Sequence, residues 1–384
     1  ELKGAPRISG PTIDVFDAKR YITTKGTRNA KWRINFNGLG SLSYCVTVER
    51  TPVIEALLAA DILGNARRFV SELAPMAAER AMSWAYLHET QSSFAIENEL
   101  PSHTKAEAFV TLLKQASLAE PLDEDYLVAL QNVCISNPLD QAVEYRQQQN
   151  WLRGPLRGAV GITYVPPPPE WVPSLMHDLL TFANEAPKQM DPLVCASVVS
   201  FAFVFVHPFM DGNGRLSRFL FHHALCRSGQ WGNGLLLPVS VAMKRSEGQY
   251  LAALQSYSKP ARQAWDVMWL GDDAFELKFK SDAAVYRYWD ATACVAFGLE
   301  MAQEALNKDL KVETEFLAQF DELFKAVNER FDVRGNDLTT LVLACLQNKG
   351  KVSVNRRKKF AATVPNSVFE ALEEEWQRLF NGFA

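Results

Sequence analysis

The 384-residue sequence lacks several features that would place it in a class at once. No apolar run reaches the roughly 20 residues that a membrane-spanning helix needs, and the longest, at 193–206, is shorter. No signal-peptide pattern opens the chain, whose first residue is Glu1 rather than Met, as expected for a trimmed product. Neither charge sign dominates, since 40 Lys and Arg face 44 Asp and Glu, and a net charge of −4 argues against a general nucleic-acid binder.

Clustered cysteines and sequence repeats are also lacking. The six cysteines are widely spaced, with no CxxC pair and no grouping with histidine, so the spacing of a metal site is missing. The run Pro166–Pro169 is the only low-complexity segment. A hydrophobic fraction of 48% with 22% charged residues is typical of a globular protein, long enough here for two or three domains. We therefore expect a cytoplasmic protein with reduced thiols in its core.

One twelve-residue stretch, HPFMDGNGRLSR at 207–218, carries most of the chemistry. His207 can take up a proton near neutral pH, and Asp211 offers the hard oxygen ligand that Mg²⁺ prefers. Small residues at 212–214 allow a tight turn whose N–H groups can bind an anion. Arg215 and Arg218 are three apart, so on a helix they share a face and can hold phosphate oxygens.

The sequence on both sides of this motif favours a turn between two buried helices. An apolar run ends at His207, and another helix-compatible run follows at 216–227, so the second helix is expected to start near Gly214. A helix N-terminus is a natural anion-binding site. The alternative is a glycine-rich turn with a chance histidine, but a turn does not require two arginines and an acid at these spacings.

These residues resemble the signature of the Fic family, H-P-F-x-(D/E)-G-N-(G/K)-R-x-x-R, at every fixed position. The resemblance implies an adenylyltransferase that uses ATP and Mg²⁺ to transfer AMP to a Ser, Thr or Tyr hydroxyl of a protein, with release of pyrophosphate. It makes His207 the general base, Asp211 the metal ligand, and the backbone of Gly212, Asn213 and Gly214 the anion hole. It assigns the β-phosphate to Arg215 and the γ-phosphate to Arg218. Tyr250, in a segment similar to the family helix that lines the nucleotide pocket, is either a nucleotide contact or a core residue.

A second pattern lies upstream, where Ser93, Glu97 and Asn98 match the (S/T)-x-x-x-E-(G/N) pattern of the family's inhibitory helix. Ser93 and Glu97 share a helix face, and Asn98 suits the end of that helix. A carboxylate is disfavoured at a helix C-terminus, so Glu97 needs a cation. The resemblance implies that this cation is Arg218, which would then be withheld from the γ-phosphate. An ordinary capped surface helix is the alternative.

A third segment, Gly161, Ile162, Thr163 and Tyr164 before the four prolines, resembles the family's flap. The flap is a short hairpin that aligns an extended segment of the target protein by strand addition. The proline run is stiff and would fix the exit from the flap. A plain proline-rich loop or a ligand for a proline-binding module is the alternative.

Other activities remain open on this sequence. The same residues would serve the removal of AMP, with Glu97 orienting a water molecule, or the transfer of another nucleotide-derived group such as UMP or phosphocholine. A DNA-binding regulator with a Fic core is an alternative from another class, but the basic run Arg356–Lys359 is short. We expect ATP and an unidentified protein acceptor, including the protein itself, as partners; we expect neither a membrane nor nucleic acid, and a homodimer stays open.

The predicted fold is mostly α. It has a Fic-type helical core with a small β-hairpin flap, an N-terminal segment with a β-hairpin at 31–49 followed by helices, and a C-terminal helical region. Helices are expected over 53–98, on both sides of a break at Glu120-Pro121, over 172–182, 281–306 and 313–331, and near 336–348 and 366–380. The predicted domains are residues 1–60, 61–135 with the inhibitory helix, 136–270 as the catalytic core, and 271–384, which is either helix-turn-helix-like or a helical lid or dimer element.

Overall fold

The computed structural model describes residues 9–135, 137–232, 234–271 and 274–380, and the first residue, Glu1, lies outside them. The chain is mostly helical with small sheets, as predicted. It forms two compact units, residues 1–67 with 85–306 and residues 68–84 with 307–384. Two helices, α2 (Ile62–Glu72) and α3 (Pro75–Ile96), run through the unit boundaries. The domain boundaries expected near residues 60, 135 and 270 remain predictions.

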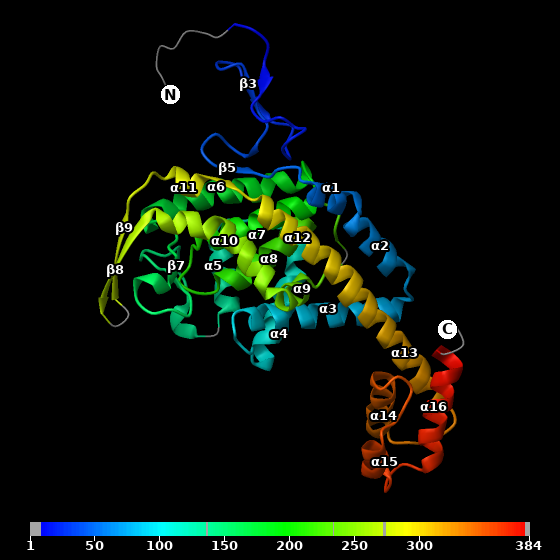
Figure 1. Cartoon of the computed structure of the whole chain (residues 1–384). Helices are drawn as coiled ribbons and strands as arrows, with labels where there is room; N and C mark the ends of the chain where they lie inside the picture. Colours follow the sequence, from blue (N-terminus) through cyan, green and yellow to red (C-terminus); the bar gives the residue numbers. More distant parts are fainter. Residues whose placement is uncertain (1–8, 136, 233, 272–273, 381–384) are drawn as a thin grey trace. The chain divides into compact units, whose positions relative to one another are not determined.

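Helix α7 (Pro192–Val206) is the centre of the larger unit, and all fifteen of its residues are buried. A helix that is apolar on every side must be enclosed by other helices. Its start is fixed by Asp191, whose side chain accepts hydrogen bonds from the amides of Leu193 and Val194. Among the helices that pack directly on α7 are α6 (Val172–Glu185), α8 (Asn213–Arg227) and α12 (Thr292–Glu304) (Figure 1).

The remaining helices of this unit cover that core. The helix α4 (His103–Gln115) packs on α5 (Glu124–Cys134), and the predicted break at Glu120-Pro121 falls between them. Helix α5 in turn contacts α8, which carries the arginines of the motif. The others are α1 (Pro52–Ala59), α9 (Val239–Arg245) and α10 (Glu247–Gln263), which all contact α12.

The N-terminal strands pair differently from the predicted hairpin at 31–49. The strand β3 (Ile34–Phe36) pairs with β1 (Ile13–Asp14) and β2 (Thr27–Asn29). The strand β5 (Cys45–Thr47) pairs antiparallel with β4 (Leu39–Gly40) and parallel with β10 (Tyr288–Asp290). Two local alternating runs suggested a single hairpin, but the two runs join different sheets. The strand β3 pairs with the strands before it, while β5 pairs locally with β4 and gains β10 as a distant partner. Because β10 follows the short helix α11 (Ala284–Arg287), it also interrupts the continuous helix expected over 281–306.

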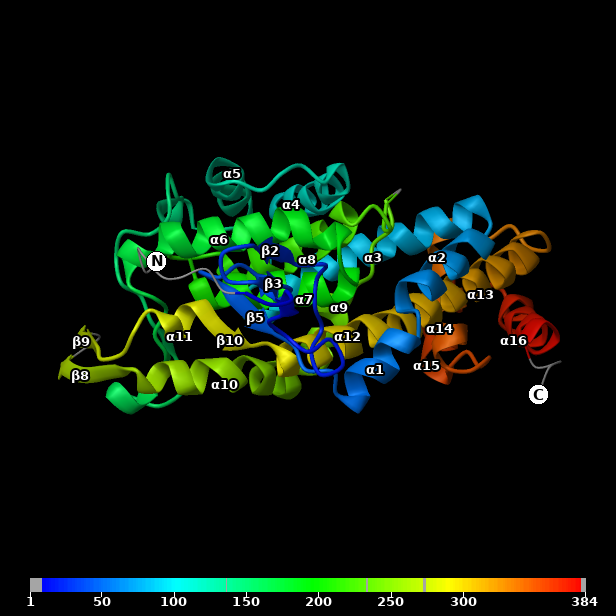
Figure 2. The same cartoon turned by 90° about the horizontal axis from the view of Figure 1, so that it is seen from above.

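A longer hairpin, β8 (Trp265–Gly271) with β9 (Ala274–Phe279), follows α10 and was not predicted. It extends from the end of α10 (Figure 2). Its inner face carries Trp265, Phe275 and Phe279, which join a small apolar cluster with Ile162 and Val165. The hairpin therefore supports the segment that was predicted to be the flap.

The smaller unit has its own core. It contains α13 (Lys311–Asn328), α14 (Gly335–Gln347), α15 (Val354–Phe360) and α16 (Asn366–Phe380), which confirm the helices predicted near 313–331, 336–348 and 366–380 (Figure 1). Leu323, Leu341 and Phe369 are completely or almost completely buried in one cluster between these helices. The basic run lies on α15, where Arg357 pairs with Glu373 of α16. None of the described helices has the length and apolar character to cross a bilayer.

Candidate active site

The HPFMDGNGRLSR motif occupies the connection between α7 and α8 and the first turns of α8. His207 ends α7 in a left-handed conformation, with φ 52° and ψ 59°, and Pro208 prevents the helix from continuing. Gly212 has φ 84°, a value that suits glycine, and α8 begins at Asn213. The prediction of a turn between two buried helices is confirmed, with the second helix starting one residue before Gly214.

Hydrogen bonds within the motif stabilise the conformation of the loop. The side chain of Asn213, which is 2% exposed, accepts a hydrogen bond from the Phe209 amide at 3.0 Å and donates one to the Phe209 carbonyl at 2.8 Å. Phe209 is buried between Tyr145 and Phe203. The Asn213 side chain therefore holds the shape of the loop, and the predicted anion hole would rely on backbone N–H groups.

The His207 imidazole is held in the neutral state. The pKa of His207 is lowered to about 4, chiefly by burial, and the nearby Arg146 guanidinium contributes in the same direction. Nδ1 lies 3.2 Å from the Val204 carbonyl, which can accept only from a protonated nitrogen. The proton of the neutral ring is thus assigned to Nδ1, which leaves the lone pair on Nε2 available as a base.

Both arginines of the motif are buried, and each is paired with a carboxylate. Arg215 donates to Glu99 Oε2 at 2.8 Å and to both oxygens of Asp211 at 3.1 and 3.2 Å. Arg218 donates to Glu97 Oε1 at 2.8 Å, to Ser93 Oγ at 2.8 Å and to the Ser93 carbonyl at 2.7 Å. The predicted ion pair between Glu97 and Arg218 is present.

Helix α3 ends at the position that the sequence pattern indicated. Asn98 has φ 59°, the left-handed conformation of a helix end, and its amide donates to the Ala95 carbonyl. The Lys244 ammonium donates to the same carbonyl at 2.9 Å, which neutralises the negative end of the helix dipole. Glu97 sits one residue past α3, where Arg218 is its cationic partner. A Cβ on Gly214 would overlap the Glu97 carboxylate, so this carboxylate fills the space beside the start of α8.

A model of the Fic/DOC family matches residues 121–225, a range that includes His207, Asp211 and both arginines. Residues 121–225 are a Fic/DOC family domain. Among curated proteins, the protein adenylyltransferase fic-1 of Caenorhabditis briggsae is 33% identical over 92 residues, which is 24% of this chain and 17% of that protein. A probable protein adenylyltransferase of Aquifex aeolicus is 33% identical over 101 residues, or 26% of this chain and 28% of that protein. The chain thus spans less than a fifth of the length of the first of these relatives.

The fold has a likeness among solved structures. A Fic family protein from Desulfovibrio desulfuricans superposes with a TM-score of 0.50 at 20% identity, over 80% of this chain and 90% of that one. The likeness extends beyond the Fic domain on both sides. At this identity it concerns the fold alone.

The flap segment before the Fic motif forms a short hairpin. The strand β7 (Ile162–Tyr164) pairs antiparallel with β6 (Leu152–Arg153), and the Gly154 amide donates to the Gly161 carbonyl. Gly161, Ile162 and Tyr164 are buried, and only Thr163 of the four predicted flap residues is exposed. The Tyr164 hydroxyl donates to the Phe205 carbonyl at 2.5 Å, which attaches the flap to the last turn of α7. The side chains of this hairpin therefore hold it against the Fic core.

Tyr250 is partly exposed and lies beside Arg218, with its ring against apolar side chains. Its ring contacts Phe201 and stacks on Phe297 at 5.6 Å. Burial raises the pKa of Tyr250 to about 12, while the positive charge of Arg218 opposes this rise. The ring of Tyr250 thus packs on aromatic neighbours without being fully buried, and a nucleotide contact stays a prediction.

Several buried polar residues around the Fic motif were not found from the sequence. Glu89 on α3 is completely buried and accepts from His222 Nε2 at 2.8 Å and from the amide and hydroxyl of Ser240. Gln131 on α5 donates to the Asp211 carbonyl at 3.2 Å. Arg146, Asn150 and Glu99 also contact the motif. Glu89 precedes Ser93 by four residues, so its helical spacing was the one available signal.

The residues present fit a magnesium ion that is shared with nucleotide phosphates. In the described part of the chain, no group of three or more His, Cys, Asp or Glu side chains could hold a metal by itself. Asp211 is the partly exposed carboxylate of the loop, and it contacts Arg215, which is predicted to bind phosphate. Mg²⁺ is commonly held by one or two carboxylates together with substrate phosphates and water, so one protein ligand is enough.

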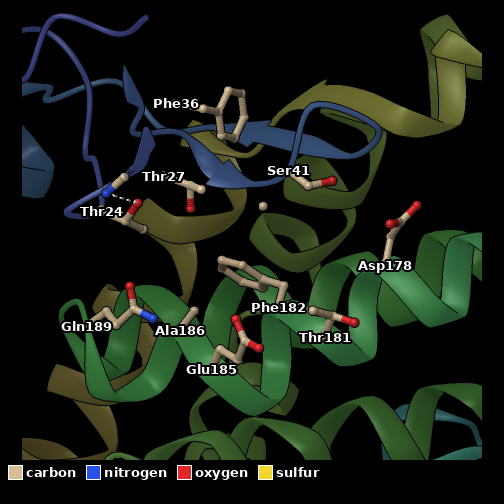
Figure 3. Close-up of a pocket in the computed structure, with 12 residues that line it drawn as sticks. Thr24, Thr27, Phe36, Ser41, Asp178, Thr181, Phe182, Glu185, Ala186 and Gln189 are labelled. Carbon is tan, nitrogen blue, oxygen red and sulfur yellow. Dashed lines mark hydrogen bonds between the residues drawn. The ribbon is translucent and has the colours of Figure 1, made fainter. Parts of the chain in front are cut away.

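A small polar pocket lies apart from the Fic motif, between the N-terminal strands and α6. Its volume is about 120 Å³, and none of the predicted site residues lines it. Hydroxyl and carboxylate side chains face it, among them Thr27, Ser41, Thr181 and Glu185 (Figure 3). Asp178 at its rim is paired with Arg287. Nothing in this pocket resembles a phosphate site, since no Lys or Arg lines it.

Proposed function

We propose that this protein is a protein adenylyltransferase that transfers AMP from ATP to a Ser, Thr or Tyr hydroxyl of a protein, with release of pyrophosphate. The observation that carries the proposal is the group formed by a neutral His207 and the buried Arg215 and Arg218 around the start of α8. The relatives that match over the Fic domain bear the name protein adenylyltransferase, which supports this choice.

In this mechanism His207 Nε2 takes the proton of the acceptor hydroxyl as its oxygen attacks the α-phosphorus. The bond between the α-phosphorus and the bridging oxygen breaks, and its electron pair leaves with pyrophosphate. Backbone N–H groups of 212–214 and the dipole of α8 stabilise the α-phosphate. Arg215 and Arg218 hold the β- and γ-phosphates. A magnesium ion bound at Asp211 would neutralise phosphate charge.

The ion pair between Glu97 and Arg218 supports autoinhibition by the end of α3. Arg218 directs three hydrogen bonds to Ser93 and Glu97, so it must leave Glu97 before it can hold a γ-phosphate. The Glu97 carboxylate also occupies the space beside Gly214. We propose that this arrangement is the resting, inhibited state, and that the flap aligns the acceptor segment when the site is open.

AMP removal is the second candidate, because the Glu97 side chain is 36% exposed. A partly exposed carboxylate can orient a water molecule, which a fully enclosed one could not. Transfer of another nucleotide-derived group uses the same phosphate contacts and remains a variant of the proposal. Cytoplasmic location, a homodimer and a DNA-binding role of the basic helix α15 stay predictions.

Labelled ATP with Mg²⁺ separates these functions. Glu97→Gly should label itself or an added protein more strongly than wild type, and the double variant Glu97→Gly/His207→Ala should not label. A pre-labelled protein that loses AMP with wild type but keeps it with Glu97→Gly would favour AMP removal. Absence of labelling by Glu97→Gly, with any nucleotide offered, would contradict nucleotidyl transfer.

A further inference from the structure

A buried arginine outside the motif connects the catalytic loop to the exit of the flap. Arg146 is 4% exposed and lies in the irregular segment between α5 and β6. Its Nε donates to the His207 carbonyl at 2.8 Å, and its Nη2 donates to the Pro167 carbonyl at 2.5 Å. Its Nη1 donates to the Gln148 carbonyl at 3.0 Å. One rigid guanidinium thus joins two segments that lie forty residues apart in the sequence.

The Arg146 guanidinium binds backbone rather than carboxylate oxygens, as Arg227 and Arg262 also do. Within the described residues, its side-chain hydrogen bonds go to carbonyl oxygens, and no carboxylate forms an ion pair with it. Burial lowers the pKa of Arg146 to about 10, which reflects the cost of removing the charge from water. Such a cost is tolerated where charge-assisted hydrogen bonds replace the lost hydration. The planar fork of arginine matches three fixed carbonyls in a way that a lysine cannot.

The carbonyl that Arg146 holds on the catalytic side belongs to a strained residue. A non-glycine residue in the left-handed region is uncommon, and His207 occupies this region. The conformation persists only where surrounding contacts fix it. The Arg146 side chain binds the carbonyl of His207, and the Arg146 amide donates to the next carbonyl, that of Pro208, at 2.8 Å. Asn150 donates to the Phe209 carbonyl, so the same segment contacts three successive residues of the loop.

The flap side is held by the same segment and by its neighbours. Gln149 donates to the Pro166 carbonyl at 3.0 Å, next to the Pro167 carbonyl that Arg146 binds. The Tyr286 hydroxyl donates to the Val165 carbonyl at 2.8 Å. The segment Val165–Pro167 is therefore fixed at three successive carbonyls. Among the described side chains that bind these carbonyls, Arg146 is the one that also bonds to the loop that carries His207.

We propose that Arg146 is a positioning residue for group transfer, which fixes the catalytic imidazole of His207 relative to the flap that aligns the acceptor hydroxyl. The expected effect on the labelling rate rests on the proposed function. The connection that Arg146 makes between the loop and the flap does not. A base must lie within hydrogen-bond distance of the proton it removes, and a displacement of about 1 Å can cost about 100-fold in rate.

The test compares Arg146→Gln and Arg146→Lys with two matched arginine variants, all in the Glu97→Gly background. Arg262 donates to the Ile162 and Ala159 carbonyls of the flap and to the Trp265 carbonyl, so Arg262→Gln loosens the flap alone. Arg227 donates to the Asn184 and Ala119 carbonyls, away from both segments, so Arg227→Gln controls for the loss of a carbonyl-binding guanidinium. Auto-labelling rates are measured against ATP concentration, and backbone amide exchange is measured by mass spectrometry.

Arg146→Gln should lower the labelling rate at saturating ATP by about 100-fold with little change in the KM for ATP. The labelling rate of Arg146→Lys should lie between those of Arg146→Gln and the Glu97→Gly parent. The rate of Arg227→Gln should equal that of the parent. Amide exchange should rise together in 207–212 and 162–165 for Arg146→Gln, but only in the flap for Arg262→Gln; the prolines after residue 165 carry no amide hydrogen. Arg146→Lys serves both measurements if Arg146→Gln does not fold.

Unchanged exchange in 207–212 would overturn the proposal, as would a rate for the Arg146 variants equal to that of Arg227→Gln. If the Glu97→Gly parent itself does not label, the proposed function fails and the exchange measurement alone decides. In that case a rise in amide exchange in both the loop and the flap of Arg146→Gln still supports the connection. A rise in amide exchange in the flap alone overturns it.

Discussion

Replacing Glu97 tests the resting state of the site most directly. Glu97→Gly removes both the partner of Arg218 and the group that fills the space beside Gly214. Glu97→Gln keeps the shape of the side chain and removes only its charge. The two variants therefore separate an electrostatic block from a steric one.

The size of the effect follows from the contacts of Arg218. Two of its three hydrogen bonds go to Ser93 and survive both substitutions, so the guanidinium stays in place. The lost contact is a charge-assisted bond to a carboxylate that is 36% exposed, and solvent screening reduces its strength. We assign it about 1–2 kcal/mol, which corresponds to a rise in labelling of about 5- to 30-fold. Glu97→Gln should give less than Glu97→Gly, because its amide still occupies the space beside Gly214.

The assay is incorporation of label from ATP with Mg²⁺ into the protein itself, at matched concentrations. Arg218→Ala should not be activated, since it loses the phosphate contact together with the ion pair, and Glu97→Gly/Arg218→Ala should resemble Arg218→Ala. A Glu97→Gly protein no more active than wild type would refute the inhibitory role. Equal activation by Glu97→Gln and Glu97→Gly would refute the steric part of the argument.

Four further predictions concern other parts of the chain. His207→Ala should lower AMP transfer by at least about 100- to 10,000-fold while nucleotide binding persists in a titration. Asp211→Ala should lower activity and flatten its dependence on Mg²⁺, and full activity of wild type in excess chelator would exclude the metal role. Burial lowers the pKa of His223 to about 4 from an ordinary value of 6.5, so the unfolded chain takes up a proton first as the pH falls. The contribution of neutral His223 to the free energy of unfolding is complete above pH 6.5 and is lost between pH 6.5 and 4. In denaturant titrations, His223→Gln should therefore show a smaller fall in the free energy of unfolding over this pH range. The basic helix with Arg356–Lys359 should bind no DNA at physiological salt, and a salt-sensitive complex in a shift assay would overturn this.

The parts of the site that could be predicted are those with a fixed local spacing. The turn between α7 and α8 follows from an apolar run that stops at His207-Pro208. The pair of Ser93 and Glu97 follows from helical spacing together with the family pattern. Arg146 shows no such signal, because it lies in a polar, irregular segment and its partners are carbonyl oxygens that every residue possesses.

The pairing of distant strands limits prediction of the fold in the same way. The hairpin of Trp265–Gly271 and Ala274–Phe279 was missed, because the second strand alternates apolar and charged residues while the first is apolar throughout residues 267–270. The parallel pairing of β5 with β10 joins segments about 240 residues apart. Nothing local distinguishes Tyr288–Asp290 from the helices beside it. Non-local contacts determine the strand conformation of these three residues, as is common for short strands.

The contacts between α3 and α8 suggest how an inhibited site could open without loss of structure. Three residues of α3 at intervals of four contact α8, which runs in the opposite direction. Glu89 contacts His222, and both Ser93 and Glu97 contact Arg218. The Glu89 contact is buried and involves no predicted phosphate ligand, whereas Glu97 lies at the partly exposed end of α3. Helix ends loosen at far lower cost than buried helix centres. On the proposed function, release of Glu97 would therefore require movement of the end of α3 alone, while the contact between Glu89 and His222 stays in place.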